Sequence, residues 1–370
     1  YKGLGMVSTV LSRYLEEPKL SDVGIGHVRY STKGGNRIEN AQPILADCNK
    51  GELAIAHNGT LSNGDTLKRG LFDEGSIFQT TSDTELILHM IARSRRDSFI
   101  DALKTTLAEL RGAFSLVMVH NGSLIGIRDP QGFRPLLFGE KDGVSVFASE
   151  SCALDILGFS SYRPVEPGEM IIVDRAGARS ERYLPSARKS HCIFELIYFA
   201  RPDSRVFNES VHMARKRMRE ALAAEETHAG DIVVPVPDSG NSAALGFSER
   251  SGVPLEFGLT RNHYAGRSFI MPTTAKRELV VRMKLHPVRD AIKGKRIFLI
   301  DDSLVRGTTS GIIVSMLKAA GAKEVHIRLS SPEIRYPCHF GIDIPTREEL
   351  ISNRMSPDEK IGRASCRERV

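Results

Sequence analysis

The stretch from Arg296 to Ser310, RIFLIDDSLVRGTTS, constrains the fold more than any other part of the sequence. Ile297 to Ile300 form a continuous apolar run, which is typical of a strand buried on both faces of a parallel sheet. Asp301 and Asp302 follow where this strand should end, and the Gly307–Ser310 loop precedes an apolar pattern with helical spacing. The sequence therefore predicts a strand–loop–helix unit of an α/β fold.

The residues after this strand suit a phosphorylated sugar. Backbone N–H groups and the N-terminus of a helix can hold a phosphate, and carboxylates can accept hydrogen bonds from ribose hydroxyls or hold Mg²⁺. An ordinary βα turn capped by Asp and Ser is the alternative. The stretch resembles the phosphoribosyl pyrophosphate (PRPP) signature of the type I phosphoribosyltransferases. The resemblance implies a PRPP site formed by Asp301, Asp302, Arg306, Gly307, Thr308, Thr309 and Ser310.

A second strand–loop–helix pattern lies upstream. Residues 231–235 form an apolar run, Pro237 to Gly240 form a loop, and a helix is expected from about Ser242. Ligands of parallel sheets bind beyond the carboxyl ends of the strands, so the two loops should converge there. The same resemblance implies that Ser239, Asp301 and Asp302 hold Mg²⁺.

A polar stretch rich in Arg and Lys, residues 261–289, separates the two patterns. It can be read as a solvated surface loop, or as a lid that closes over pyrophosphate and supplies cations. The resemblance favours the lid and implies that Arg282 and Lys284 bind PRPP.

The first half of the chain reads as an α+β domain with largely antiparallel sheets. Its motifs are GHVRYST from Gly26, HNG from His57, SDTE from Ser82 and GAFS from Gly112. Each has a structural explanation: HNG suits a hairpin turn, Ser82 with Glu85 suits a helix cap, and Arg29 suits a surface ion pair.

Together and in this order, the motifs resemble the class II glutamine amidotransferases, an N-terminal-nucleophile hydrolase family. The resemblance implies that Arg29 binds the α-carboxylate of glutamine and Asp83 its α-amino group. Asn58 and Gly59 would form the oxyanion hole of the tetrahedral intermediate. The family nucleophile is an N-terminal Cys, whereas this sequence starts at Tyr1. We therefore expect a fragment that lacks the nucleophile and does not hydrolyse glutamine.

Residues 1 to 359 resemble the amidophosphoribosyltransferase family throughout, in stretches such as FELIYFARPDS, NHYAGRSFI and SSPEIRYPCHFGID. The resemblance implies an enzyme that transfers ammonia from glutamine to C1 of PRPP, giving 5-phosphoribosylamine, glutamate and pyrophosphate in the first committed step of purine synthesis. It implies a glutamine amidotransferase domain over 1–185 and a phosphoribosyltransferase domain over 186–360. A non-catalytic PRPP-binding regulatory protein is the alternative, and a salvage enzyme would not need the first half.

Two cysteines raise the question of a cluster. The family resemblance implies that Cys192 and Cys338 are two ligands of a structural [4Fe–4S] cluster, which requires four thiolates. Two unligated cysteines are the alternative. The resemblance also implies a homotetramer inhibited by purine nucleotides.

Composition and the chain ends bound the remaining possibilities. The chain has 370 residues, a formal net charge of +6 and five scattered cysteines, with no apolar run long enough to span a bilayer. We expect a cytoplasmic protein that binds neither membranes nor nucleic acid, because no basic run is interleaved with aromatic residues. The basic tail, residues 361–370, we expect to be non-native.

Overall fold

The computed structural model describes residues 1–16, 21–29, 37–185, 188–262, 279, 281–344 and 346–354. The chain divides into two compact units. Unit 1 comprises residues 1–192 together with Cys338–Asp343, and unit 2 comprises Ile193–Pro337 and the residues from Ile344 onward. The segment 338–343 therefore packs with unit 1, although in the sequence it lies between two parts of unit 2.

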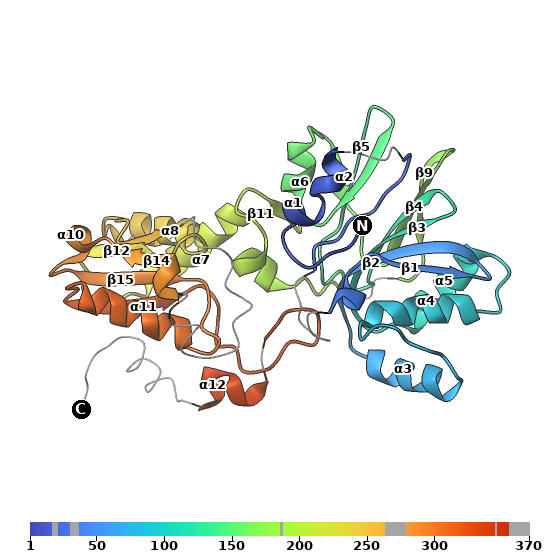
Figure 1. Ribbon diagram of the computed structural model, residues 1–370. Helices are drawn as coiled ribbons and strands as arrows, with labels where there is room; N and C mark the ends of the chain where they lie inside the picture. The colour runs from blue at the N-terminus through green and yellow to red at the C-terminus, as the bar shows by residue number, and fades with distance from the viewer. Residues whose placement is uncertain are drawn as a thin grey trace. The chain divides into compact units, whose positions relative to one another are not determined.

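Unit 1 is built on a six-stranded antiparallel sheet of order β1-β2-β3-β4-β8-β9 (Figure 1). The strands are β1 (Ile44–Cys48), β2 (Gly51–Leu61), β3 (Gly112–His120), β4 (Ser123–Arg128), β8 (Glu169–Asp174) and β9 (Gly177–Arg182). β3 and β4 are joined by Asn121 and Gly122, both at positive φ, as a two-residue turn of a right-twisted hairpin requires. The predicted α+β class with antiparallel sheets is confirmed for this unit.

Helices α3 (Gly64–Asp73), α4 (Asp83–Arg93) and α5 (Phe99–Glu109) accompany this sheet. α4 and α5 lie against one of its faces (Figure 1), and the core between them includes Ile55, Leu86, Leu103 and Leu116. A smaller antiparallel sheet, β6-β5-β7, completes the unit. Its elements are β5 (Leu137–Lys141), β6 (Val144–Ala148), α6 (Ser151–Ile156) and β7 (Tyr162–Pro164).

One interpretation of the sequence is wrong here. The polar stretch Arg175–Ser190 reads as a connector between domains, yet Gly177–Arg182 form strand β9 and pair with β8 along their whole length. Five of the six residues of β9 are exposed, namely Gly177 to Ser180 and Arg182. An edge strand with little buried surface lacks the apolar alternation by which strands are recognised.

Unit 2 is built on a parallel sheet of order β12-β15-β16, formed by β12 (Ile232–Pro235), β15 (Arg296–Asp301) and β16 (Glu324–Leu329). Ile297 and Leu299 pack towards α11 (Thr308–Ala319). Phe298 and Ile300 pack on the opposite side, where α7 (Val211–Ala224) and α8 (Asn241–Ser251) contribute Ala223 and Phe247. Both faces of β15 are therefore buried, which confirms the α/β interpretation of its apolar run.

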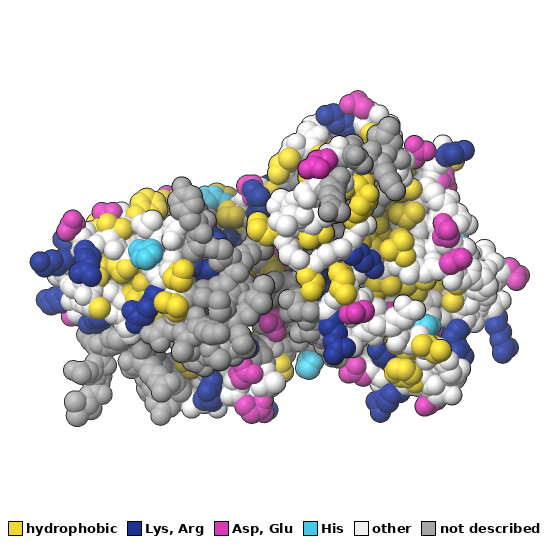
Figure 2. Space-filling view, viewed as in Figure 1, with side chains coloured by type: hydrophobic (Ala, Val, Ile, Leu, Met, Phe, Trp, Pro, Cys, Tyr) yellow, Lys and Arg dark blue, Asp and Glu magenta, His cyan; other side chains and the backbone are white. Residues whose placement is uncertain are grey.

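The remaining elements are short. In unit 1 they are α1 (Val7–Val10), α2 (Ser12–Glu16) and η1 (Ile38–Asn40). In unit 2 they are η2 (Glu195–Phe199), β10 (Arg205–Val206), β11 (Glu209–Ser210), β13 (Leu259–Arg261), β14 (Leu285–Pro287), α10 (Arg289–Ile292), η3 (Arg347–Glu349) and α12 (Ile351–Arg354). No helix in the described ranges combines the length and the apolar character needed to cross a membrane. On the face shown in Figure 2, Lys and Arg side chains occur over both units with acidic side chains among them.

Candidate functional site

The acidic pair lies at the carboxyl end of β15, where the sequence predicts it. Asp301 is the last residue of the strand, and its carboxylate accepts a hydrogen bond of 2.9 Å from the N–H of Asp302. The carboxylate of Asp302 also accepts hydrogen bonds from the hydroxyls of Ser303 and Ser239. The backbone carbonyls of the pair are held by Ser330 and Ser331, which follow β16. The structure thus ties the backbone of the pair to the residues after β16 and the carboxylate of Asp302 to the loop after β12.

The loop after β12 meets this pair. The N–H of Val236 donates to the carbonyl of Ile300 at 2.8 Å, and Gly240 lies so close that an added Cβ would be 2.4 Å from that same oxygen. Gly240 is therefore needed for close packing, because its own φ of −79° suits any residue. The convergence of the two loops at one edge of the parallel sheet agrees with Brändén's rule.

Thr308, Thr309 and Ser310 form the first turn of α11, whereas the sequence was interpreted as placing them in a loop. Gly307 precedes them at φ +77°, and an added Cβ would lie 2.5 Å from Ile351 Cδ1. The N–H groups of a first helical turn have no partner within the helix, so they can bind an anion. These three residues therefore lie in a helix instead of a loop, and their position still suits the binding of a phosphate.

Three predicted PRPP-binding cations lie at different places. Arg306 Nε donates to Glu349 Oε2 at 2.7 Å, so this side chain contacts the short helical segment η3. Arg282 and Lys284 lie in the helical residues 281–284 that lead into β14. Residues 263–278 and 280, which make up most of the predicted lid, lie outside the described residues.

Burial dominates the electrostatics of the acidic pair. It raises the pKa of Asp301, and the neighbouring charge of Asp302 raises it further. Burial likewise raises the pKa of Asp302, against the hydrogen bonds from Ser303 and Ser239. Two adjacent carboxylates in such a place ionise together only at a cost, which a divalent cation removes.

The donor set fits Mg²⁺. This ion is commonly held by one or two carboxylates, with substrate phosphates and water completing its shell. Asp301, Asp302 and the Ser239 hydroxyl offer such a partial set. Within the described ranges, no group of three or more His, Cys, Asp and Glu side chains is arranged to hold a metal ion.

A guanidinium behind the pair was missed by sequence reasoning. Arg219 of α7 is fully buried, and its Nη2 donates to the carbonyls of Asp301 and Arg328. Its Nε and Nη1 have no hydrogen-bond partner among the described residues. Burial lowers the pKa of Arg219 to about 9, against the attraction of Asp301 and Asp302. A helical Arg among other basic residues gives no sequence signal of such burial.

The HNG motif lies within β2 rather than in a hairpin turn. β1 pairs with β2 only from Gly51 to Ile55, so the edge of β2 beyond Ile55 is not covered by that strand. On this edge the N–H of His57 donates to Gln42 Oε1 at 2.6 Å, and the N–H of Leu61 donates to Asp83 Oδ2 at 2.8 Å. Because N–H groups alternate between the edges of an antiparallel strand, the N–H of Gly59 points to the same edge, between these two.

Gly59 tolerates no side chain. Its φ is +144°, and an added Cβ would lie 2.0 Å from the carbonyl oxygen of Ala113 on β3. Gly341 in turn approaches Gly59 so closely that its own added Cβ would lie 2.9 Å from the Cα of Gly59. The segment 338–343 therefore passes directly against the predicted oxyanion hole. Nothing in the local sequence indicates this return of the chain.

Asp83 is the first residue of α4, after the N-cap Ser82. Burial pushes the pKa of Asp83 up, but His57 and the hydrogen bond from Leu61 hold it below the usual value. Arg29 interacts electrostatically with Asp83, while burial lowers the pKa of Arg29. The structure thus brings Arg29, Asp83 and the Gly59 edge together, and Asn58 is the direct neighbour of Gly59.

The predicted cap is correct in its first half only. Ser82 Oγ accepts the N–H of Thr84. The Glu85 carboxylate instead accepts the N–H groups of Gln79 and Thr80 at 2.8 and 2.7 Å. Glu85 therefore orders the loop before the helix rather than closing a capping box.

Both predicted cluster cysteines belong to unit 1 and lie near Phe133. The N–H of Cys192 donates to the Phe133 carbonyl at 3.1 Å. Cys338 Sγ accepts the N–H of Phe340, whose ring stacks on Phe133 with centroids 4.4 Å apart. A [4Fe–4S] cluster needs four thiolates. These two supply half of such a set, so the described residues do not form a complete cluster site.

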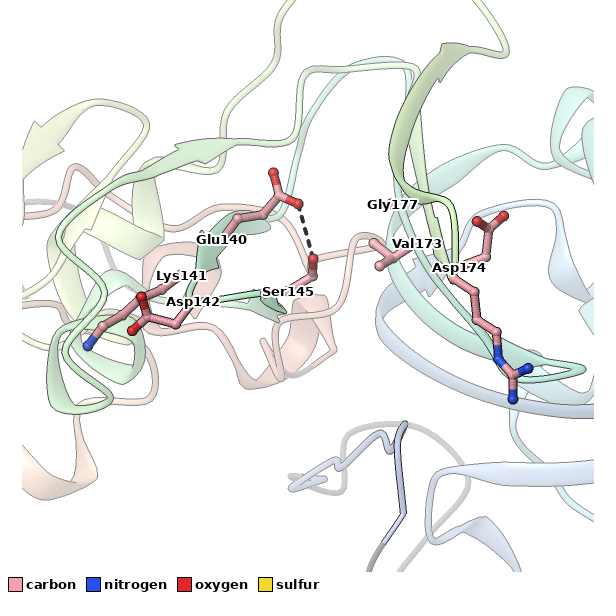
Figure 3. A pocket seen from close by; sticks show the side chains of 9 residues that line it. Glu140, Lys141, Asp142, Ser145, Val173, Asp174 and Gly177 are labelled. Carbon is pink, nitrogen blue, oxygen red and sulfur yellow. Dashed lines mark hydrogen bonds between the residues drawn. The ribbon is translucent and has the colours of Figure 1, made fainter.

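A cavity of about 490 Å³ lies elsewhere in unit 1, between the β5–β6 hairpin and the turn after β8 (Figure 3). Ser145 donates to Glu140 on the hairpin, and Asp174 lies across from them. None of the predicted site residues lines this cavity.

Comparison with known proteins agrees with both halves of this description. Residues 27–155 match a family model described as a glutamine amidotransferase domain. The chain is 47% identical to amidophosphoribosyltransferase 1, chloroplastic, of Arabidopsis thaliana over 96% of this chain, and it spans 63% of the length of that relative. It is also 47% identical to the amidophosphoribosyltransferase of Bacillus subtilis (strain 168), with 97% of this chain and 76% of the relative covered.

A solved structure supports the same assignment. The glutamine PRPP amidotransferase from B. subtilis complexed with ADP and GMP matches with a TM-score of 0.83 and 48% identity, over 90% of this chain and 73% of that one. The predicted fold class, an N-terminal-nucleophile amidotransferase domain followed by a type I phosphoribosyltransferase domain, is thereby confirmed. The chain belongs to the amidophosphoribosyltransferase family.

Proposed function

We propose that this chain is part of an enzyme that transfers ammonia, taken from glutamine, to C1 of PRPP and releases pyrophosphate. The product is 5-phosphoribosylamine, the first committed intermediate of purine synthesis. One observation carries the proposal: Ser239, Asp301 and Asp302 meet at the carboxyl edge of β12 and β15, beside the first turn of α11.

In unit 2 the first turn of α11 is suited to the 5-phosphate of PRPP. Its free N–H groups and the hydroxyls of Thr308, Thr309 and Ser310 can donate to phosphate oxygens, and the helix dipole favours the negative charge. The carboxylates of Asp301 and Asp302 can accept hydrogen bonds from the ribose hydroxyls. Gly307, with no side chain, lets the backbone approach the ligand.

Mg²⁺ would be held by Asp301, Asp302 and Ser239, and it would neutralise pyrophosphate charge as the C1–O bond breaks. Arg282 and Lys284, together with Arg306, are the side chains we assign to the pyrophosphate. For Arg306 this requires that its contact with Glu349 be exchanged for the ligand.

In unit 1 we assign glutamine binding to the edge of β2. Arg29 would bind the α-carboxylate through a bidentate guanidinium–carboxylate contact, and Asp83 would bind the α-ammonium. The N–H of Gly59 and the amide of Asn58 would donate to the oxyanion of the tetrahedral intermediate. Support comes from the position of the Gly59 N–H between two occupied N–H groups, on the part of the β2 edge that does not pair with β1.

Other features belong to the same proposal. We assign Cys192 and Cys338 as two ligands of a [4Fe–4S] cluster, supported by their common neighbour Phe133; iron and sulfide analysis of the protein tests this. Purine nucleotides as inhibitors, a homotetramer and a cytoplasmic location are proposed from the family. The domain boundary between residues 185 and 186 stays a prediction, as does the non-native origin of residues 361–370, which lie outside the described residues.

The experiment supplies the chain with PRPP, Mg²⁺ and ammonium, so that unit 2 is tested without glutamine. We expect pyrophosphate release and phosphoribosylamine formation that depend on Mg²⁺ and are lost in Asp301→Asn. PRPP binding without product would contradict the enzyme assignment and favour a non-catalytic PRPP-binding regulator.

A further inference from the structure

Asp129, a fully buried residue directly after β4, has no role in the proposed function. Its carboxylate accepts hydrogen bonds from three backbone N–H groups. Oδ2 accepts those of Phe114 at 3.3 Å and Phe133 at 3.1 Å, and Oδ1 accepts that of Gln131 at 3.0 Å. Burial raises the pKa of Asp129 to about 6, against these hydrogen bonds and the charge of Arg128. The carboxylate therefore ties β3 to the turn that follows β4.

On β3, the hydrogen bond from Phe114 leads to Gly59. Phe114 is the register partner of Gly59 on β2. Because the N–H of Gly59 points away from β3, the two residues form a non-hydrogen-bonded pair, in which the Cα atoms of paired residues are only about 4.5 Å apart. The backbone of Phe114 faces Asp129 instead, and its carbonyl accepts the N–H of Asp129 at 2.8 Å. Asp129 thus fixes the part of β3 against which Gly59 packs.

In the turn after β4, the hydrogen bond from Phe133 leads to the opposite side of the same glycine. The ring of Phe133 stacks on Phe340, with centroids 4.4 Å apart and planes inclined by 15°. Phe340 precedes Gly341, where an added Cβ would lie 2.9 Å from the Cα of Gly59 and 3.0 Å from its carbonyl carbon. The backbone of Gly59 is therefore packed between β3 and the segment 338–343, and Asp129 supports both neighbours.

We propose that Asp129 is a positioning residue, which fixes the Gly59 peptide between β3 and the segment 338–343 so that the Gly59 N–H points at the carbonyl oxygen of an amide substrate. The naming of that substrate as glutamine rests on the proposed function. A donor stabilises an oxyanion best when it is held in place before the reaction. Gly59 has no side chain to hold it, so its position comes from its neighbours. Asp129 acts through Phe114 and Phe133.

The first test is Asp129→Asn. Asparagine has nearly the same shape, but its NH₂ group cannot accept a hydrogen bond, so one of the backbone N–H groups loses its acceptor. Glu169→Gln is the matched control, because Glu169 is also a buried carboxylate of unit 1. Its partners are Arg163, Ser180 and the N–H of Glu166, which lie outside the contacts described above.

The second test breaks the same chain of contacts at a partly exposed position, so that the proposal is tested even if Asp129→Asn does not fold. Phe340→Ala removes the stacking on Phe133. Phe72→Ala is its control, because Phe72 is an exposed phenylalanine of unit 1 with a similar aromatic neighbour, Phe78, at a centroid distance of 5.0 Å.

Amide NMR of the whole chain gives the position of the Gly59 N–H. The amide signals of His57 and Leu61, which lie on the same strand edge, serve as internal references. A merely structural role of Asp129 would change these two signals as strongly as that of Gly59. Calorimetric titration with L-glutamine gives the affinity of unit 1, and titration with PRPP and Mg²⁺ reports on unit 2.

In the unsubstituted chain we expect L-glutamine to shift the Gly59 amide proton downfield. Asp129→Asn and Phe340→Ala should each move the Gly59 signal of the free chain, reduce its response to L-glutamine and weaken glutamine binding by about tenfold, the order expected for one misplaced hydrogen bond. The two controls should leave all three unchanged, and PRPP binding should not change in any variant. An unchanged Gly59 signal in Phe340→Ala, or equal changes in Asp129→Asn and Glu169→Gln, would overturn the proposal.

The two levels of inference fail differently. If the unsubstituted chain does not bind L-glutamine while the Gly59 signal moves as expected in the variants, the assignment of the substrate is wrong and the placement of the Gly59 N–H by Asp129 stands. If L-glutamine binds equally to the variants and to the unsubstituted chain, the positioning role is wrong and the substrate assignment stands.

Discussion

The two candidate sites hold their carboxylates in opposite electrostatic situations. In unit 1 the pKa of Asp83 lies below its usual value, because His57 and the Leu61 N–H outweigh burial. In unit 2 burial raises the pKa values of Asp301 and Asp302, and the charge of Asp302 raises the pKa of Asp301 further. Asp83 is thus kept ionised by the protein itself, as the recognition of an ammonium requires. The acidic pair has raised pKa values, so the proposed Mg²⁺ would favour the ionised form of both carboxylates.

The backbone around the two sites differs as well. The unit 2 site lies at the carboxyl ends of parallel strands, where consecutive residues supply most of the groups. The unit 1 site lies along a strand edge and collects residues from distant segments, including Gly341. Glycine is required in both sites. Gly59 has a positive φ and no room for a Cβ, whereas Gly240 has an ordinary φ and lacks only the room for a Cβ.

The largest expected effect is that of alanine at these two glycines. Gly59→Ala and Gly240→Ala should each destabilise their own unit by about 3–5 kcal/mol, because each Cβ would meet a backbone carbonyl. Gly177→Ala is the control, since Gly177 has φ +110° but open space around it. It should cost only about 1 kcal/mol. Hydrogen exchange of β2 and β12 peptides follows the units separately, and equal effects of all three substitutions would contradict the steric account.

Asp301→Asn should separate function from stability in unit 2. We expect the affinity for PRPP with Mg²⁺ to fall at least about 100-fold, or ~3 kcal/mol, since a metal-binding carboxylate is lost. Without Mg²⁺ the variant should be as stable as the original chain or more stable at pH 8. An acid with a raised pKa in the folded state loses stability as pH rises from its unfolded pKa, about 4, to its folded pKa, and asparagine removes this loss. Urea unfolding from pH 4 to pH 8 checks the sign.

The effect of Asp83→Asn on stability should depend on pH in the opposite direction to that of Asp301→Asn. The pKa of Asp83 is depressed in the folded state, so its contribution is present above the unfolded pKa and disappears as pH falls below about 4. We expect a destabilisation of about 1 kcal/mol at pH 7 that becomes smaller as pH falls below about 4. If Asp83→Asn and Asp301→Asn respond to pH in the same direction, the contrast between the two sites is wrong.

The smallest effect tests whether the segment 338–343 belongs to unit 1. Phe340→Ala removes the stacking on Phe133, and because Phe340 is partly exposed we expect a loss of about 1 kcal/mol in unit 1. Phe257→Ala is the control, since Phe257 is a more exposed phenylalanine of unit 2. Faster hydrogen exchange in β12 than in β2 after Phe340→Ala would contradict the assignment.

Much of unit 2 could be predicted from the sequence, because its signals are local. The apolar run of β15 reports burial on both faces, and the acidic pair with Gly307 follows within seven residues of the strand. In unit 1 the turn at Asn121 and Gly122 also has a local signal, because its backbone needs positive φ and an Asn-Gly pair adopts it readily.

The rest could not be predicted, because it depends on distant parts of the chain. Arg219 contacts the carbonyl of Asp301 across 82 positions, and Gly341 approaches Gly59 after the first part of unit 2, Ile193–Pro337, has intervened. The ring of His57 contacts Thr84 and Ala113, which lie on two other elements. No periodicity or motif spacing records such contacts.

The most direct test of the central claim is calorimetric titration of the chain with PRPP, with and without Mg²⁺. If the proposed function is right, the buried acidic pair would repel the pyrophosphate group in the absence of a divalent cation. We predict measurable binding only with Mg²⁺, and none in Asp301→Asn under either condition. Equal binding of PRPP with and without Mg²⁺ would contradict the assignment of this pair as a cation-dependent site.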